Sequence, residues 1–404
     1  GKKDKANQFY SLPEYDVWLK NNNDGYGYQL KYYKGLGTST PEEARSYFKD
    51  FKLVIYHWDN LSNESIDKAF NKDRSDDRKD WLLNFNDQIL ELGQLSVSFT
   101  EFINCDLIQF SMEDNHRSLP HLMDGVKPSQ RKILYCAFKR NLVNEIKVAQ
   151  LAGYVSENGA YHHGEASLQG AIVGMAQNYP GTNNINLLVP EGQFGTRLQG
   201  GKDFAAPRYI FTYLSSMAQK LFIKSDNPLL KYTTDDGQKV EPEFYTPILP
   251  LVLINGSDGI GTGWSSKIPQ FNPLDLINNV RLMIDGNEPK ELDPWYRGFK
   301  GNIIKLEKNS WMTKGVYKLV NKTTIEITEL PIGCWTNNYK EMLDKMVIGL
   351  PLKEDKKGTK GGKGGKGKKL QQVKKNKNLK IQTNDTNNKD DGRILKDYIN
   401  ESSD

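Results

Sequence analysis

The stretch EIKVAQLAGYVSENGAYHHGEASLQGAIVGMAQNY, residues 145–179, contains two apolar repeats with helical spacing. One face of the second repeat holds four apolar residues: Leu168, Ile172, Met175 and Ala176. The segment AYHH, residues 160–163, breaks the repeats and leads into Gly164, which suits a tight turn. Two short helices joined in this way form a helix-turn-helix.

The preceding segment PSQRKILYCAFKRN, residues 128–141, also has helical spacing and is rich in positive charge. Five basic residues lie within fourteen positions: Lys127, Arg131, Lys132, Lys139 and Arg140. If one face of this helix meets DNA, these residues supply several phosphate contacts. An exposed amphipathic helix has the same pattern, so the residues alone leave both interpretations open.

Residues 185–214, INLLVPEGQFGTRLQGGKDFAAPRYIFTYL, contain two apolar runs on either side of a glycine-rich segment. This arrangement predicts a β-hairpin with a large loop. A helix-turn-helix followed by such a hairpin is a winged helix.

Tyr209 lies in this hairpin, directly after Arg208 and seven residues after Lys202. A tyrosine hydroxyl ordinarily has a pKa near 10, so only about one in a thousand is ionised at neutral pH, and a catalytic tyrosine needs cationic help. A guanidinium binds phosphate oxygens as a fork and stays charged. However, neighbours in a strand point to opposite faces, and a packed core aromatic is the alternative interpretation.

Two histidines, His162 and His163, stand in the turn before the second helix, followed by Gly164 and Glu165. A histidine in this position can donate to phosphate oxygens beside the positive end of the helix, or transfer a proton. A histidine that caps or packs the turn is the alternative.

The flanking segments predict further α/β structure. A strand-like run at residues 28–33 precedes Thr40, Pro41 and Glu43, which together form a helix start. Residues 60–93 are polar and predict exposed helices. Their cluster of four aspartates is interleaved with cations, which indicates a solvated face rather than a metal site: Asp73, Asp76, Asp77 and Asp80.

The C-terminal part of the sequence changes character twice. Three strand-like runs, at residues 301–306, 316–320 and 323–331, predict a separate α/β module. Residues 356–369 then hold seven lysines and six glycines in fourteen positions, which predicts a disordered insertion. Contact of this tract with nucleic acid is a minority interpretation.

Composition limits the class of protein. The chain has 404 residues, a net charge of +5 and three widely spaced cysteines, which argues against a disulfide framework or a cysteine zinc site. No apolar run is long enough to cross a membrane, and no signal peptide is evident, so we expect a soluble intracellular protein. The first residue is not methionine, which suggests that the chain begins inside a longer protein.

Six motifs, taken in order, resemble the breakage-reunion region of eukaryotic type IIA DNA topoisomerases. They are KYYKGLGTST (31–40), RSLPHLMDGVKPSQRK (117–132), KVAQLAGYVSENGAYHHGEASL (147–168), NLLVPEGQFGTRLQGGKDFAAPRYIF (186–211), PILPLVLINGSDGIGTGWS (247–265) and TIEITELP (324–331). The resemblance covers nearly all of residues 8–345 and lapses in the lysine-glycine tract.

The resemblance implies an ATP-dependent enzyme, active as a homodimer, that cleaves double-stranded DNA, passes a second duplex and reseals the break. Tyr209 corresponds to the nucleophile that becomes linked to a 5′ end, and Arg208 to the arginine beside it. Arg131 corresponds to an arginine near the scissile phosphate. His163 is our choice for the active-site histidine, with His162 in reserve.

The same resemblance implies further contacts with DNA. Ile260 corresponds to an isoleucine that wedges between base pairs and bends the duplex. The other expected DNA-binding residues are four lysines and a histidine: Lys34, Lys127, Lys132, Lys202 and His162.

We therefore expect an α+β multidomain protein. Residues 1–60 are expected to form the C-terminal part of a Toprim domain, and residues 61–100 a helical linker. Residues 101–265 are expected to form a winged-helix domain with the catalytic tyrosine. Residues 266–404 are expected to form an incomplete α/β tower domain with the insertion near residues 354–392.

The resemblance also implies Mg²⁺ and ATP, both bound by parts of the enzyme that precede this sequence, and it implies a nuclear location. No residue of this sequence is expected to bind the metal. The second hypothesis is a winged-helix DNA-binding protein without covalent chemistry, and the third is a dimer scaffold whose activity resides elsewhere.

Overall fold

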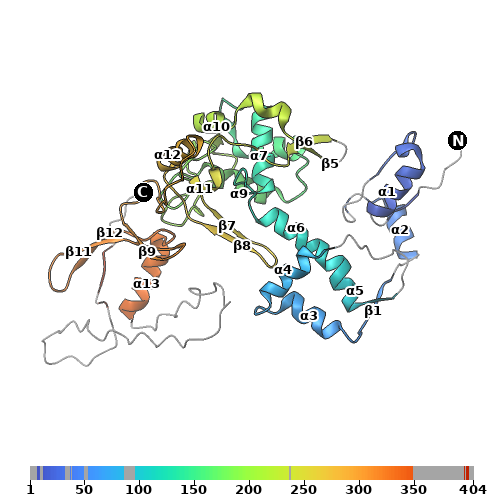
Figure 1. The fold of residues 1–404 in the computed structure, drawn as a ribbon, viewed down its shortest axis with the longest axis horizontal. Coiled ribbons are helices and arrows are strands. Elements are labelled where there is room, and N and C mark those ends of the chain that lie inside the picture. The colour runs from blue at the N-terminus through green and yellow to red at the C-terminus, as the bar shows by residue number, and fades with distance from the viewer. Residues whose placement is uncertain are drawn as a thin grey trace. The chain divides into compact units, whose positions relative to one another are not determined.

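The computed structural model describes residues 7–9, 12–31, 37, 39–49, 53–85, 96–235, 238–348, 395 and 397–399. It divides into two compact units, drawn as a ribbon in Figure 1. Unit 1 comprises Gly1–Pro120 with Asp258–Lys267, and unit 2 comprises His121–Ser257 with Ile268–Asp404. Lys34 and the insertion near residues 354–392 lie outside the described residues, and the bounds of the four predicted domains stay a prediction.

Unit 1 consists mainly of short helices. These are α1 (Leu12–Asn21), η1 (Asn23–Gly25), α2 (Pro41–Lys49), α3 (Ser62–Phe70), α4 (Ser75–Leu83), α5 (Phe99–Glu101), the π-helical η2 (Phe102–Leu107) and α6 (Ile108–Ser118). Strand β1 (Ile55–His57) pairs in parallel with β2 (Ser96–Ser98). Strands β7 (Ser257–Ile260) and β8 (Ser265–Ile268) pair with each other, and the segment between them belongs to this unit.

The predicted helix start at Thr40 is confirmed. The Thr40 backbone N–H donates to the Glu43 carboxylate at 2.7 Å, and the Glu43 N–H donates to the Thr40 hydroxyl at 3.3 Å. Each side chain therefore accepts the backbone hydrogen bond of the other residue, which is the pattern of a capping box. The strand expected at residues 28–33 is wrong for its described part, because residues 28–31 form no strand. An alternating pattern of apolar and polar residues does not form a strand where no described strand pairs with the segment.

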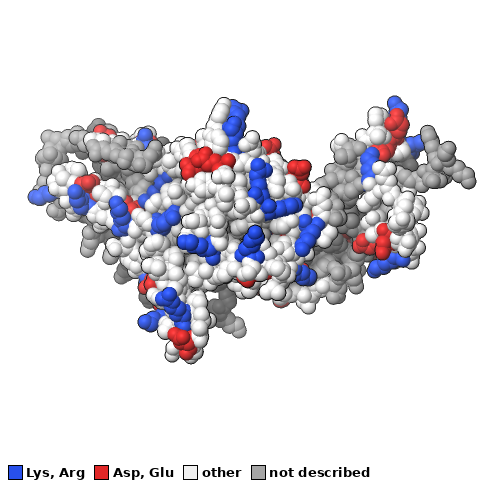
Figure 2. Space-filling model, turned by 90° about the horizontal axis from the view of Figure 1, so that it is seen from above, with Lys and Arg blue, Asp and Glu red and all other residues white. Residues whose placement is uncertain are grey.

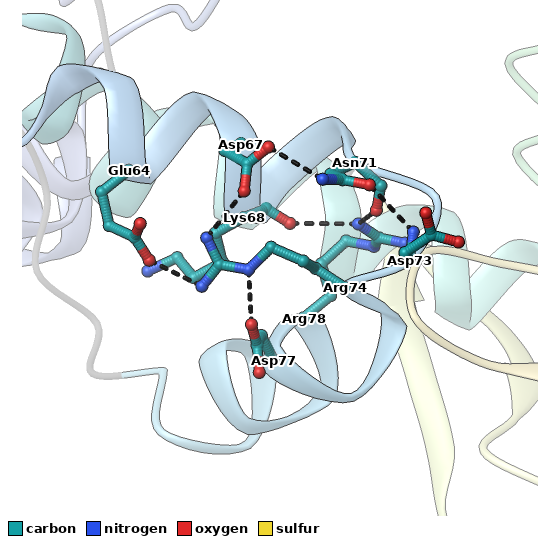
Figure 3. A network of polar contacts seen from close by, with 8 residues as sticks. All are labelled: Glu64, Asp67, Lys68, Asn71, Asp73, Arg74, Asp77 and Arg78. Atoms are coloured by element: carbon teal, nitrogen blue, oxygen red, sulfur yellow. Dashed lines mark hydrogen bonds and ion pairs between the residues drawn. The ribbon is translucent and has the colours of Figure 1, made fainter. Parts of the chain in front are cut away.

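The acidic cluster of unit 1 is organised around an arginine. Arg74 binds Glu64 at 2.6 Å and Asp67 at 3.0 Å, and its Nε donates to Asp77 (Figure 3). Arg78 donates to the backbone carbonyls of Lys68 and Asn71 in the same view. The expected exposed helices are therefore present, and Arg74 pairs with three of their carboxylates.

Unit 2 contains the remaining helices and four further strand pairs. The helices are α7 (Pro128–Lys139), α8 (Val148–Asn158), α9 (Glu165–Ala176), α10 (Ser216–Leu221), η3 (Lys224–Leu229), α11 (Leu251–Ile254), α12 (Pro273–Ile284) and α13 (Thr336–Ile348). The antiparallel pairs are β3 (Ile146–Lys147) with β4 (Phe211–Thr212), β5 (Tyr232–Asp235) with β6 (Gln238–Pro242), β9 (Asn302–Glu307) with β10 (Ser310–Lys314), and β11 (Val316–Leu319) with β12 (Ile325–Glu329). The helices predicted at residues 128–179 and the strands predicted after residue 300 are thus confirmed.

The core of unit 2 lies where α7, α8 and α9 pack together. Its completely buried side chains include Ile133, Leu134, Leu151, Leu168 and Ile172. Burying each such side chain contributes roughly 1.5–3 kcal/mol, so this three-helix contact is a rigid base for the loops around it. The apolar spacing that predicts the helices is the same spacing that fills this core.

The predicted hairpin after α9 is confirmed by two antiparallel bridges, Leu188 with Leu214 and Glu191 with Phe211. Phe211 also belongs to β4, which pairs with β3, the strand that directly precedes α8 in the chain. The hairpin therefore connects the large loop to the start of α8.

Candidate active-site turn and DNA-contacting residues

Tyr209 ends a tight turn that presents its side chain to solvent. Its backbone N–H donates to the carbonyl of Ala206 at 2.9 Å. The Tyr209 side chain is 65% exposed, whereas the next residue, Ile210, is 2% exposed and belongs to the core. The interpretation of Tyr209 as a packed core aromatic is therefore wrong.

The N-terminus of α8 holds this turn on both sides of the tyrosine. The Val148 N–H donates to the carbonyl of Ile210 at 3.0 Å, and the Ala149 N–H donates to the carbonyl of Pro207 at 3.1 Å. The first N–H groups of a helix have no partner inside the helix, so here the turn supplies the acceptors. A helix anchored in the core thus fixes the position of an exposed phenol.

Arg208 lies on the same side as the tyrosine. Its guanidinium carbon is 4.8 Å from the centre of the Tyr209 ring, within the range of a cation–π contact. The opposite-face argument for strand neighbours does not apply, because β4 begins only at Phe211. A permanent positive charge therefore lies beside an exposed tyrosine.

The loop before the turn is folded tightly on itself. Gly195 and Gly201 both have positive φ, and a Cβ on Gly195 would lie 2.5 Å from the carbonyl oxygen of Gly201. Gln177 donates to the carbonyls of Phe194 at 2.9 Å and of Gly201 at 3.3 Å. Lys202 is exposed at the end of this ordered loop.

Arg197, in the same loop, is committed elsewhere. Its guanidinium pairs with Glu329 of β12 and donates to the carbonyl of Leu330 at 2.7 Å. It therefore fastens the loop to β12.

Asp203 closes the same loop and provides a pH-dependent test of its order. It accepts hydrogen bonds from the backbone N–H of Thr196, at 2.9 Å, and from the Thr196 hydroxyl. Burial acts to raise the pKa of Asp203, but these hydrogen bonds outweigh it and lower the pKa below its ordinary value of 3.8. The stabilisation is present above the unfolded-state pKa and is lost as the pH falls through the folded-state pKa.

We therefore expect the hydrogen-exchange protection factors of the Thr196 and Gly201 amides to be constant near neutral pH and to fall only below pH 3.8. The Asp203→Asn variant should lose protection at neutral pH already, because its amide accepts less strongly. Equal protection in both proteins at every pH would contradict this role of Asp203.

Arg131 differs from its expected place on an exposed basic face. The Arg131 side chain is 3% exposed, and its Nε and Nη2 donate to the two carboxylate oxygens of fully buried Asp124 at 2.7 and 3.0 Å. Nη2 also donates to the carbonyl of Val126 at 3.0 Å. The prediction of an exposed basic face is therefore wrong for Arg131, because its side chain points inward to a buried carboxylate.

The other basic residues of α7 fall into two groups. Lys132 is largely buried, with 14% of its side chain exposed, and pairs with Glu241 at 2.9 Å, whereas Lys127, at the N-cap, is intermediate in exposure. Lys139 and Arg140 are exposed and lie over the rings of Tyr135 and Tyr154. Figure 2 looks onto unit 2 from the side of α10 and the β5–β6 hairpin, where Lys and Arg side chains are spread across the middle of the view.

The two histidines have different surroundings. The His162 Nε2 atom lies 3.3 Å from a carboxylate oxygen of Asp235. His163 is exposed, and its ring stands edge-on to Tyr161 with centroids 5.4 Å apart. Sequence reasoning missed Asp124 and Asp235 as partners, because both reach their basic residues only through the fold.

Ile260 lies in unit 1 at the end of β7, and its side chain is 78% exposed. The flanking glycines allow close packing: a Cβ on Gly259 would lie 2.4 Å from the Ser118 carbonyl, and one on Gly261 would lie 2.1 Å from Asn115. The two glycines lie against α6, and the isoleucine points outward.

Two kinds of feature are absent from the described residues. Among them, no three His, Cys, Asp or Glu side chains come together as a possible metal site. No described helix is both long and apolar enough to cross a membrane.

Comparison with known proteins gives the family. Residues 117–387, more than half of the chain, match the family profile of the A-type subunits of DNA gyrase and topoisomerase IV. The chain belongs to this family. Residues 1–115 match the C-terminal associated domain of TOPRIM.

Eukaryotic topoisomerases are among its relatives. The chain is 50% identical over 351 residues to a probable DNA topoisomerase 2 of Dictyostelium discoideum, with 85% of the chain and 23% of the relative aligned. It is 50% identical over 358 residues to human DNA topoisomerase 2-alpha, with 84% of the chain and 23% of the relative aligned. The chain therefore spans about a quarter of these relatives.

A solved structure supports the same assignment. The crystal structure of the Plasmodium falciparum topoisomerase II DNA-binding, cleavage and re-ligation domain matches with a TM-score of 0.72 and 47% identity. The match covers 86% of this chain and 48% of that one. The resemblance to a eukaryotic type IIA topoisomerase is thus confirmed, as is the mixed α/β fold.

Proposed function

We propose that this chain is the DNA gate of an ATP-dependent type II DNA topoisomerase and that Tyr209 is its nucleophile. The observation that carries the proposal is the exposed tyrosine beside Arg208 on a turn fixed by α8. In the reaction, the phenolic oxygen attacks a backbone phosphorus and the bond to the 3′ oxygen breaks. The protein becomes linked to the 5′ end, and the reverse attack reseals the strand.

The remaining site residues are assigned by the same proposal. Arg208 offsets charge on the phosphate, because a guanidinium stays protonated and binds two oxygens at once. His163 donates to the phosphate from its exposed ring. Arg131, held by Asp124, acts as a support for the α7 region, and a direct phosphate contact is the competing possibility tested below.

Several basic residues fit a duplex partner. Lys202 at the end of the glycine loop is exposed, Lys127 precedes α7 at its N-cap, and Lys132 follows Arg131 with a side chain that is 14% exposed. These lysines, together with His162 and Lys34, are proposed to contact DNA. We assign residues 101–265 to a winged-helix domain and residues 266–404 to a tower domain. The enzyme is proposed to act as a nuclear homodimer.

Magnesium and ATP are part of the proposal for the full-length enzyme. Magnesium would stabilise the charge that develops on the leaving oxygen. The described residues of this chain offer no set of ligands that fits the ion, so none of the steps above is assigned to it. ATP would drive the opening and closing of the gate, since the phosphotyrosyl bond itself conserves the energy for resealing.

A covalent-adduct assay tests the proposal. Full-length protein is incubated with supercoiled DNA, magnesium and ATP, quenched with detergent, and examined for protein attached to 5′ ends. We expect an adduct whose mass maps to the peptide containing Tyr209. DNA binding without any adduct would instead support a winged-helix DNA-binding protein without covalent chemistry.

The Ile260→Ala variant tests the proposed wedge. We expect reduced DNA bending in a fluorescence-transfer assay, because a methyl group cannot fill the space between two base pairs. The free energy of unfolding should change by less than about 0.5 kcal/mol, since the side chain is exposed. Substitution of exposed Leu274 of α12 by alanine offers a matched control. Equal bending by Ile260→Ala and the unsubstituted protein would count against the wedge.

A further inference from the structure

Lys132 lies at the centre of a polar cluster that joins three segments of unit 2. Its Nζ donates to the carbonyl of Gly159 at 2.7 Å and to Glu241 at 2.9 Å, and it lies 3.7 Å from Asp235. Its side chain is 14% exposed. One cation from α7 therefore holds the backbone at the end of α8 and two carboxylates of the β5–β6 hairpin, Asp235 and Glu241.

Asp235 uses its two oxygens for different partners. One faces Lys132, and the other lies 3.3 Å from His162 Nε2. A carboxylate that accepts from Nε2 favours the state in which this nitrogen carries the proton, and it fixes the plane of the imidazole ring. The turn between α8 and α9 is thus held at Gly159 by Lys132 and at His162 by Asp235.

His163 is left with a different environment. Its ring stands against Tyr161, which is buried in the core of unit 2. Within the part of the chain that the structure describes, no hydrogen bond joins the His163 ring to another residue. The cluster therefore separates the two adjacent histidines into one that is anchored by a carboxylate and one whose nitrogens are available to a ligand.

We propose that Asp235 is a positioning residue for DNA cleavage, which anchors His162 and thereby orients His163 toward the scissile phosphate. This role rests on the proposed function. Lys132 and Glu241 keep the carboxylate in place, since the lysine charge binds both Asp235 and Glu241. The Asp235–His162 pair is about one-third exposed, so it adds little to folding stability and its main effect is on geometry.

The test compares Asp235→Asn with Asp235→Glu in the full-length enzyme. For Asp235→Asn we expect the rate of adduct formation at saturating DNA to fall on the order of tenfold, the scale of a small misplacement in an active site. The dissociation constant for DNA should stay within about twofold. Asp235→Glu should recover part of the rate, and Asp226→Asn on η3 is the matched control with no loss.

A double-mutant cycle separates positioning from a general structural effect. In the His163→Ala background, Asp235→Asn should reduce the rate no further, because the group that it orients is gone. The ring nitrogen signals of His162 should also shift in Asp235→Asn, a readout that needs no catalysis. An equal loss of rate in both backgrounds, or unshifted His162 signals, would overturn the proposal.

Failure of the proposed function gives a different result. If the unsubstituted enzyme forms no adduct, the topoisomerase chemistry itself is wrong. If the adduct forms at an unchanged rate in Asp235→Asn, only the role of Asp235 is overturned.

Discussion

The Tyr209→Phe variant of the full-length enzyme should form no detectable 5′ adduct, with a loss of roughly 10⁴-fold or more, as expected when a covalent nucleophile is removed. Phenylalanine keeps the ring and its contact with Arg208 but lacks the oxygen that attacks phosphorus. DNA affinity should change little, because the surrounding cations remain. The measurement is a detergent-quenched cleavage assay run beside a binding titration.

Tyr213 provides the matched control for this variant. It lies four residues further along the same segment, and its hydroxyl donates to Glu191 at 3.3 Å. Tyr213→Phe loses that hydrogen bond, at a cost of about 1 kcal/mol, and should keep its cleavage activity. Adduct formation by Tyr209→Phe at the rate of Tyr213→Phe would remove Tyr209 from the mechanism.

The helices of unit 2 were predictable from the sequence because burial of one helix face imposes a helical period on the apolar residues. The apolar side chains of α8 and α9 face a single core. In unit 1, the Thr40–Glu43 cap of α2 was predictable because its two residues lie within four positions of each other. The same reasoning misplaces residues 28–31, where an alternating pattern has no described partner strand. Local patterns therefore predict elements well when their partners are also local.

The exposure of Tyr209 was not predictable in this way. An apolar run on one side and a proline on the other suit a buried strand as well as a turn. The decisive contacts come from α8, whose Val148 and Ala149 lie about sixty residues earlier and bind the backbone around the tyrosine. Only the order of motifs along the chain points to the role proposed for Tyr209.

The burial of Arg131 was likewise not predictable from the pattern of charged residues in the sequence. On a helical wheel it belongs with the other basic residues of α7, and nothing nearby marks it as buried. Its partner Asp124 precedes the helix, and the Asp124 carboxylate also accepts from the backbone N–H of Tyr245, 121 residues away at 3.0 Å. Because the fold brings these segments together, Arg131 forms an internal ion pair with Asp124, although its place in the sequence pattern suits a contact with DNA.

The Arg131→Met variant should therefore lose about 3–5 kcal/mol of stability, the usual cost of leaving one member of a buried ion pair alone. Asp124 is fully buried and keeps only the N–H groups of Val126 and Tyr245 as donors. The expected result is a lower urea midpoint and faster hydrogen exchange in α7. Arg140→Met, at the exposed end of the same helix, should stay within about 0.5 kcal/mol.

The two possible roles of Arg131 give opposite patterns in this experiment. If the arginine mainly supports the fold, Asp124→Asn combined with Arg131→Met should recover part of the lost stability, because the neutral amide no longer needs a cation. If the arginine mainly holds the phosphate, Arg131→Met should remain as stable as Arg140→Met and yet lose adduct formation at saturating DNA. The buried pair with Asp124 favours the first pattern, and a stable but inactive Arg131→Met would show that the guanidinium leaves Asp124 when DNA binds.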